Sequence, residues 1–372
     1  MKRAIYFLLL FITIPTTIVY LASCSTPYIP PYNFWPLTFL AIGFPFIAIS
    51  LFGLLVLWFF FNRKISFVLL LLFFVGYKNL SSALAINLPS SFNYKKDSSH
   101  IRVISWNVTF FENASKHADS ATSERRIMIN YLKKANADVL LLQEFRDLAA
   151  NPAIYSNLEV LRDTLGYKYV YQNNDFVTTW SYGTSYEGCA ILSKYPITDT
   201  GKILYPGLTN NESIAFADII IHNKKVRFFT THLLSMSLFK AEEVQQEGKF
   251  INSDRLLNQG RSRFDTIHYY DSIHARQAQL YKKVIATSPY PVVVSGDFNS
   301  LPTSYVYHTI RGKLKDAFLK KGVGFGQTYI ALSPTLRIDY ILLDPKFKVG
   351  QFTSPRFKAS DHFPVVADVS IR

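Results

Sequence analysis

The hydrophobic pattern of the chain changes near residue 90. Residues 1–90 consist mainly of long runs of Leu, Phe, Ile and Val, whereas the later residues alternate short apolar segments with polar ones. Between these parts, 89–99 is rich in Pro, Ser, Asn and Lys and lacks apolar periodicity, which is typical of a linker. The pattern predicts a membrane region at 1–88, a linker at 89–99 and a folded domain at 100–372.

Three apolar stretches of the first region are predicted as membrane helices. They cover 4–23, 37–61 and 65–86. The first two are long enough to cross a bilayer. The third is shorter, and it crosses only if Lys78 extends towards the interface and the helix continues beyond it.

The charged residues of this region predict its orientation. Residues 1–90 contain no Asp or Glu and only five basic residues, which are Lys2, Arg3, Arg63, Lys64 and Lys78. Basic helix ends stay in the cytoplasm, so three crossings place the C-terminal domain outside it, and two crossings reverse this result. We expect three crossings in a bacterial inner membrane, with an extracytoplasmic domain. An alternative interpretation treats 1–24 as a signal peptide with Cys24 as the acylated residue.

Beyond residue 100, strand-like and helix-like segments alternate, which predicts an α/β domain whose sheets are covered by helices. Two segments, 123–135 and 273–286, have the apolar spacing of amphipathic helices. Eight segments are predicted as strands: 101–106, 139–143, 189–193, 215–221, 226–231, 292–296, 338–343 and 364–371.

Composition narrows the class of partner. Removing the five basic residues of 1–90 from the net charge of +14 leaves +9, which suits a phosphate ester or an acidic lipid headgroup. The irregular segment 233–272 carries Arg255, Arg261 and Arg263, and it is interpreted either as a substrate-facing insertion or as a solvated loop. Two cysteines do not support a disulfide framework, and Cys189 is predicted to be a small buried hydrophobe.

Polar side chains recur where the predicted strands end. A buried strand that ends in a carboxylate is costly to desolvate unless a cation or a hydrogen-bond donor compensates. Several such ends therefore predict one shared site. The residues concerned are Asn107, Glu144, His232, Asp297, Asn299, Asp339, Asp361 and His362.

These residues stand in five motifs that together resemble the endonuclease/exonuclease/phosphatase superfamily over 101–372. The motifs are WN at 106–107, LQE at 142–144, GDFN at 296–299, RIDYIL at 337–342 and SDHFPV at 360–365. That superfamily includes deoxyribonuclease I-like nucleases, abasic-site endonucleases, inositol polyphosphate phosphatases and bacterial sphingomyelinases. The resemblance implies an α/β four-layer sandwich of two mixed β-sheets flanked by helices.

The resemblance also implies a metal site and a base. Glu144 corresponds to the principal magnesium ligand, with Asn107 and Asp361 near the same ion or the phosphate. Mg²⁺, or Mn²⁺ in its place, prefers such carboxylate and amide oxygens, and the sequence lacks the His/Cys spacing of zinc sites. Asp297 is expected to deprotonate the attacking water, and Asn299 to hold the phosphate or the water in line.

Two histidines complete the implied site. Asp339 is expected to orient His362, which would contact a phosphoryl oxygen. His232 is similar to the second histidine of the deoxyribonuclease and sphingomyelinase branches, and Glu187 is its expected partner. His232 would protonate the leaving oxygen.

The sequence therefore predicts a membrane-anchored, magnesium-dependent hydrolase of phosphoesters, with nuclease-like phosphodiester cleavage favoured. Hydrolysis of a lipid headgroup or another small phosphoester stays open, as in sphingomyelinases or inositol-phosphate phosphatases. An inactive membrane-tethered binding protein of the same fold would be expected to lose Glu144, Asp297, Asp339 or His362, and all four are present. The expected partners are the bilayer and a phosphoester substrate, either nucleic acid or lipid headgroup, with no obligate protein partner.

Overall fold

The computed structural model describes residues 2–112, 123–149, 156–180, 183–206, 212–235, 263–330 and 333–371. These residues divide into two compact units. A helical unit contains 2–84, 263–279 and 300–310, and a sheet unit contains the remaining described residues from 85 onward. Most of the segment 233–272, including Arg255 and Arg261, lies outside the described residues.

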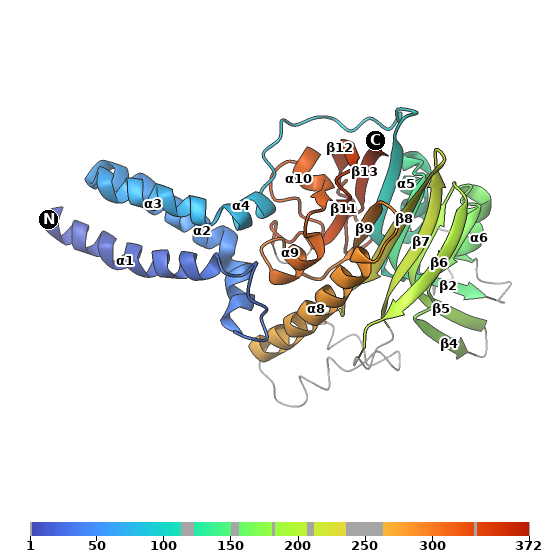
Figure 1. The fold of residues 1–372 in the computed structure, drawn as a ribbon, viewed down its shortest axis with the longest axis horizontal. Coiled ribbons are helices and arrows are strands. Elements are labelled where there is room, and N and C mark those ends of the chain that lie inside the picture. The colour runs from blue at the N-terminus through green and yellow to red at the C-terminus, as the bar shows by residue number, and fades with distance from the viewer. Residues whose placement is uncertain are drawn as a thin grey trace. The chain divides into compact units, whose positions relative to one another are not determined.

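The helical unit begins with the apolar helices that the sequence predicts. They are α1 (Lys2–Ser23), α2 (Pro36–Phe61), α3 (Arg63–Val75) and α4 (Tyr77–Ala83), drawn in blue in Figure 1. Among the described residues, α1 and α2 are long and apolar enough to cross a membrane. Tyr20, Phe44 and Trp58 are fully buried where these helices pack together.

The predicted helix at 65–86 is divided in the structure. It breaks at Gly76, where α4 turns by 68° from α3, and α4 ends at Ala83. Glycine is a poor helix former, and a Cβ at Gly76 would collide with the Tyr20 hydroxyl of α1. The close approach of α1 therefore requires glycine at position 76, and glycine at this position weakens the helix. The bent pair counts as a third span only if both helices cross together.

The helical unit also includes segments from late in the sequence. The first part of α8 (Arg263–Ala286) belongs to it, as does most of α9 (Tyr305–Arg311). Thr38 donates a hydrogen bond of 2.6 Å to Asp271, and Thr303 donates one of 2.7 Å to the carbonyl of Ala41. The apolar helices are thus packed against polar chain that the sequence assigns to the C-terminal domain.

The sheet unit contains two mixed β-sheets. The first sheet has the order β12-β13-β1-β2-β5-β3, with β4 also paired to β5, and the second has the order β10-β11-β9-β8-β7-β6. The first consists of β1 (Ile101–Asn107), β2 (Val139–Ala149), β3 (Tyr169–Gln172), β4 (Phe176–Trp180), β5 (Gly183–Ser193), β12 (Phe347–Thr353) and β13 (Val365–Ile371). The second consists of β6 (Ile197–Leu204), β7 (Ser213–Ile221), β8 (Lys224–His232), β9 (Val292–Asp297), β10 (Lys315–Asp316) and β11 (Asp339–Leu343).

The core explains the apolar pattern of the strands. Alternate residues of β1 point to opposite faces, so that Val103 packs between the two sheets and Ile104 packs under a helix. That helix is α5 (Glu124–Ala135), which begins at the N-cap Ser123 and places Met128 and Leu132 on the first sheet. Helices on the outside and two sheets inside confirm the predicted sandwich (Figure 1).

Shorter helices and several unpredicted strands complete the unit. The helices are η1 (Thr109–Glu112), α6 (Asn157–Glu159), η2 (Val160–Thr164) and α10 (Ala317–Lys321). Strands β3, β4, β6, β10 and β12 are not predicted from the sequence. β6 shows why, because it is an edge strand whose residues are mostly exposed and which therefore lacks an apolar run.

Candidate active site

The candidate residues meet at one end of the sandwich because of strand direction. β1 and β2 are parallel in the first sheet, and β8 and β9 are parallel in the second, so their C-terminal ends lie at common edges. His232 is opposite Asp297 in the β8–β9 register, and Asp339 is opposite Asp297 in the β9–β11 register. Residues far apart in the sequence are therefore neighbours at Asp297.

Asn107 connects the two sheets at this edge. Its Nδ2 donates to Glu144 Oε1 at 3.1 Å and to Asp297 Oδ2 at 3.1 Å. Its Oδ1 accepts from the backbone N–H of Thr109 at 3.1 Å, which fixes the orientation of the amide. The end of β1 thus holds a carboxylate from each sheet.

Glu144 occupies an irregular position of the backbone. The register of β2 with β5 shifts between Leu142 and Phe145, and Glu144 adopts a positive φ of 46°. A residue with a Cβ adopts such a conformation at a cost of about 1–3 kcal/mol, and such residues cluster at functional sites. The bulge turns the carboxylate to the edge of the sheet, where its side chain is 17% exposed.

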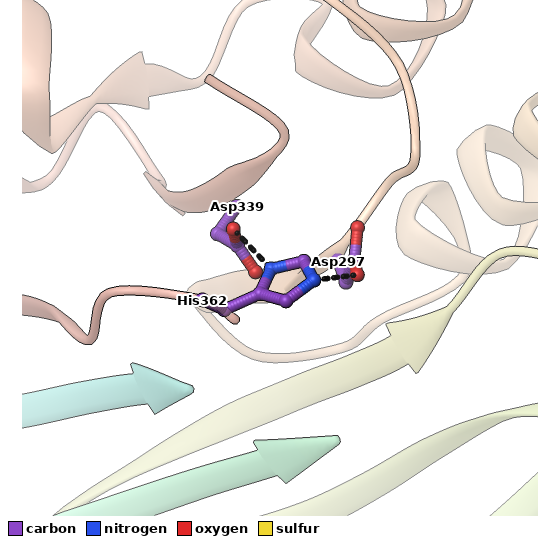
Figure 2. A group of neighbouring side chains, drawn as sticks. All are labelled: Asp297, Asp339 and His362. Atoms are coloured by element: carbon purple, nitrogen blue, oxygen red, sulfur yellow. Dashed lines mark hydrogen bonds and ion pairs between the residues drawn. The ribbon is translucent and has the colours of Figure 1, made fainter. Parts of the chain in front are cut away.

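Asp339 and His362 form the buried pair that the sequence predicts. His362 Nδ1 lies 2.9 Å from Asp339 Oδ2, and His362 Nε2 lies 3.5 Å from Asp297 Oδ2 (Figure 2). Burial alone lowers the pKa of His362, but the charges of Asp339 and Asp297 outweigh it and raise the pKa to about 10. His362 therefore carries a positive charge at neutral pH.

His232 forms a second pair, but its partner is not the predicted one. Its Nδ1 lies 3.3 Å from Glu212 Oε1, while Glu187 accepts a hydrogen bond of 2.7 Å from Arg146. In the β2–β5 register Arg146 is directly opposite Glu187, so the guanidinium of Arg146 forms an ion pair with the carboxylate of Glu187. The expected pairing of Glu187 with His232 is therefore corrected to Glu212.

The environment of His232 also favours its charged form. Its Nε2 lies 3.5 Å from Glu144 Oε1 and 3.6 Å from Asp297 Oδ2. Burial lowers the pKa of His232, but the hydrogen bond and charge of Glu212, with the charges of Glu144 and Asp297, raise it to about 10. Asp297 is consequently flanked by two imidazolium groups.

Asp297 and Asn299 belong to one tight loop after β9. The Asn299 backbone N–H donates to Asp297 Oδ1 at 2.9 Å, and Asn299 Nδ2 donates to the carbonyl of Leu233 at 2.9 Å. Before the loop, Gly296 has a φ of +144°, and a Cβ there would collide with the backbone carbonyl of Thr231. Burial raises the pKa of Asp297 to about 6, against the opposing charge of His362, so its carboxyl is ionised at neutral pH.

Asp361 lies at the more open side of the group. Its side chain is 42% exposed, and its Oδ1 accepts a hydrogen bond of 2.7 Å from Thr109. Ser360 donates to the carbonyl of Asn107 at 2.8 Å and accepts from the N–H of His362 at 3.0 Å. These bonds attach the C-terminal motif to the end of β1.

Three residues near the site were not identified from the sequence. They are Thr109, Glu212 and Tyr329, and the ring centroid of Tyr329 lies 5.0 Å from that of His362. A tyrosine, a threonine and a glutamate outside the apolar strand motifs carry no local signal. By contrast, Cys189 is buried as predicted.

Two sets of side chains have donors for a divalent cation. Glu144, Asn107 and Asp361 offer only oxygen atoms, as Mg²⁺ and Mn²⁺ prefer, and Glu144 and Asp361 keep partial exposure. Asp297, Asp339 and His362 have ligand atoms within 4.8 Å of one another. In that second set His362 Nδ1 is bonded to Asp339 and the ring is charged, so metal binding at Nε2 would require the proton of Nε2 to leave. The oxygen set therefore fits a hard cation better.

Two parts of the chain match known families of sequences. Residues 104–362 match the model of the Endonuclease/Exonuclease/phosphatase family, and residues 6–83 match a domain of unknown function (DUF8431). No curated protein matches the chain.

Several solved structures are similar to this chain. An endonuclease/exonuclease/phosphatase from Beutenbergia cavernae DSM 12333 is 19% identical with a TM-score of 0.51, over 73% of this chain and 72% of that one. D. rerio TDP2 complexed with single strand DNA product is 17% identical with a TM-score of 0.49, over 74% and 100%. The human Nocturnin catalytic domain with bound sulfate anion is 17% identical with a TM-score of 0.49, over 74% and 95%.

Proteins of the endonuclease/exonuclease/phosphatase superfamily, which are built on such a two-sheet sandwich, are hydrolases that act on phosphoester bonds. Since the family match covers more than half of the sequence, the chain belongs to the Endonuclease/Exonuclease/phosphatase family. The predicted family and fold are thereby confirmed.

Proposed function

We propose that the protein is a magnesium-dependent hydrolase that cleaves a phosphodiester by in-line attack of water, as nucleases do. The observation that carries this proposal is the position of Asp297 Oδ2, 3.5 Å from His362 Nε2 and 3.6 Å from His232 Nε2. A carboxylate holds each histidine on its other ring nitrogen. A base placed between two cations suits attack on an anionic ester, because the cations compensate the charge that develops in the transition state.

Asp297 is the proposed general base. The N–H of Asn299 and the amide of Asn107 donate to its two oxygens, so the carboxylate is fixed in orientation. It is ionised at neutral pH and can accept one proton from the attacking water, whose oxygen then forms the new bond to phosphorus. Asn299 is the proposed group that holds the water or the phosphate in line.

The two histidines are proposed to act on opposite sides of the reaction. His362, clamped by Asp339, donates a hydrogen bond to a phosphoryl oxygen and keeps its proton. His232, held by Glu212, gives its proton to the leaving oxygen as the bond to phosphorus breaks. A proton donor for the leaving group is most useful when that group is a poorly stabilised alkoxide, as in a phosphodiester.

Glu144, Asn107 and Asp361 are the proposed metal-binding residues. When bound there, Mg²⁺ would polarise a phosphoryl oxygen and neutralise negative charge. Thr109 donates to Asn107 Oδ1 and to Asp361 Oδ1, and these bonds hold the two oxygens at one edge of the sandwich.

The helices α1 and α2 are proposed to anchor the enzyme in a membrane. If α3 and α4 together form a third span, the basic ends of the helices place the catalytic domain outside the cytoplasm. Fusion of a reporter after Arg372 tests this. Activity of alkaline phosphatase but not of a cytoplasmic reporter is expected, and the reverse result would contradict the three-span orientation.

The catalytic proposal is tested with the full chain in detergent and Mg²⁺. Substrates are plasmid DNA, sphingomyelin, inositol phosphates, and aryl phosphate mono- and diesters. Hydrolysis of a diester that disappears with chelator and with Asp297→Asn is expected. Preference for a monoester or a lipid would redirect the substrate assignment, whereas equal, background rates for wild type and Asp297→Asn on every substrate would favour the inactive binding protein.

A further inference from the structure

The extended chain that follows α4 is hydrogen-bonded to a loop of the sheet unit. Ala85 and Gly324 exchange two backbone hydrogen bonds of 2.9 Å, and Asn87 Nδ2 donates to the carbonyl of Gly322 at 2.7 Å. Ala85 is only 4% exposed. The extended segment is thus attached through alternate residues to the loop that follows α10.

The opposite face of this segment is apolar and exposed. Side chains alternate along an extended chain, so Ile86 and Leu88 point away from the residues that dock. Ile86 is 87% exposed and Leu88 is 89% exposed. Val323, beside Gly324 on the bridged loop, is 49% exposed and lies on the same face as Ile86 because the bridge is antiparallel.

Basic residues adjoin these apolar side chains. Lys320 and Lys321 end α10, directly before the bridged loop, and both are exposed. No acidic residue occurs between Asp316 and Asp339, and Asp316 itself is buried against Arg337. We call Ile86, Leu88, Val323, Lys320 and Lys321 the exit patch.

The exit patch lies close in the chain to the apolar helices. Only Leu84 and Ala85 separate Ile86 from Ala83, the last residue of α4, and these three steps of the chain span at most about 11 Å. Exposed single aliphatic residues are common on proteins, but here two lysines directly precede the bridged loop, and the bridged segment directly follows helices suited to a membrane. Apolar side chains beside lysines are the composition of segments that insert into the headgroup region of a bilayer.

We propose that the exit patch inserts into the interface of a bilayer that contains anionic lipid, with Ile86, Leu88 and Val323 among the acyl chains and Lys320 and Lys321 at the headgroup phosphates. This inference rests on the membrane anchoring in the proposed function and goes beyond it. The sheet unit is then held on the lipid surface by its own residues as well as by its covalent attachment to the apolar helices.

The experiment uses the full chain reconstituted in phosphatidylcholine vesicles with and without phosphatidylglycerol. Ile86→Cys and Val323→Cys are labelled with an environment-sensitive fluorophore, and nitroxide lipids serve as quenchers. Val177→Cys is the matched control, because Val177 is an apolar β4 residue that is 56% exposed outside the patch. Native Cys24 and Cys189 are buried, so the unsubstituted chain is the labelling blank.

Quenching at positions 86 and 323 is expected to exceed that at 177 by about threefold, since interfacial segments lie about 5–10 Å deep. Charge reversal by Lys320→Glu with Lys321→Glu should remove at least about half of the gain that phosphatidylglycerol causes at position 86. Lys224→Glu with Lys225→Glu, two neighbouring exposed lysines of β8, should leave that gain unchanged.

Equal quenching at 86 and 177, or an equal response to both lysine pairs, would overturn the inference. Release of the chain from vesicles by alkaline carbonate would overturn it together with the anchoring. Loss of phosphoesterase activity in the unlabelled chain would contradict only the catalytic proposal, so the failures are distinguishable.

Discussion

Two carboxylate–histidine pairs flank Asp297, and they differ in how firmly they are enclosed. Asp339 and His362 are 2.9 Å apart, with side chains 0% and 6% exposed. Glu212 and His232 are 3.3 Å apart, with side chains 10% and 12% exposed. The buried Asp339–His362 pair, with its shorter distance, suits a histidine whose charge is fixed. The Glu212–His232 pair, which is longer and more exposed to water, suits a histidine that releases and regains a proton.

The two pairs also differ in the other contacts of the histidine. The carbonyl of His362 accepts a hydrogen bond of 2.9 Å from Trp106, and its ring packs against Tyr329. His232 Nε2 instead faces Glu144, Asp297 and Asn299, which are all proposed catalytic or metal-binding groups. The comparison assigns His362 to charge stabilisation and His232 to proton transfer, and the following predictions test that division.

The largest effect is expected at the residue that both pairs share. Asp297→Asn removes the base but keeps the shape of the side chain, and kcat should fall on the order of 10³-fold or more. Steady-state hydrolysis of a phosphodiester measures this. Asp199→Asn, which changes a carboxylate that is 60% exposed, is the matched control and should retain wild-type kcat.

The losses of kcat caused by substituting the two histidines should depend differently on the leaving group of the substrate. His362→Gln should lower kcat by about 10²–10³-fold for every diester, because a charge at the phosphoryl oxygen is lost. His232→Gln should cost a similar factor with an alkoxide leaving group and much less with nitrophenolate, which needs no proton. Equal losses of the two variants on both substrates would remove the proposed division of roles.

The carboxylates behind the histidines should give smaller effects. Glu212→Gln should lower kcat by about 10-fold, as expected for a residue that orients another. Glu187→Gln is its natural control, because Glu187 binds Arg146, and it should leave kcat within about twofold while lowering Tm. Should Glu187→Gln prove the more damaging to kcat, the partner of His232 has been assigned incorrectly.

Asp175, near the second pair, should make stability depend on pH. Burial raises the pKa of Asp175 to about 6, and the charge of Glu212 adds to this against the hydrogen bond from Ser213 and the charge of Lys202. The folded state thus prefers the protonated form, whose stabilising contribution is complete below about pH 4 and is lost as the pH rises through 6. Relative to wild type, Asp175→Asn should gain as much as about 3 kcal/mol between pH 4 and pH 8.

Thermal melting of both chains across that pH range measures the difference. The informative quantity is the change with pH of the stability difference between the two chains. A hydrogen bond lost by the substitution would shift this difference equally at pH 4 and at pH 8. A stability difference that stays constant from pH 4 to pH 8 would contradict a raised pKa at Asp175.

Much of the site was predictable because its residues adjoin buried strands. Glu144, Asp297 and His362 each stand beside an apolar run, and such runs form strands wherever they are buried. Edge strands such as β6 lack this signal. The break at Gly76 was also missed, since it depends on the approach of Tyr20 from another helix.

The sequence by itself determined the apolar N-terminal helices, the α/β character of most of the later chain and the identity of most candidate site residues, because these features are written in contiguous runs and motifs. The partner of His232 was decided only by the tertiary structure. Ile214 is opposite Thr231 in the β7–β8 register, which brings Glu212 to His232, while the β2–β5 register gives Glu187 to Arg146. Which of two carboxylates meets a histidine depends on strand register, and register is set by the packing of the whole sheet.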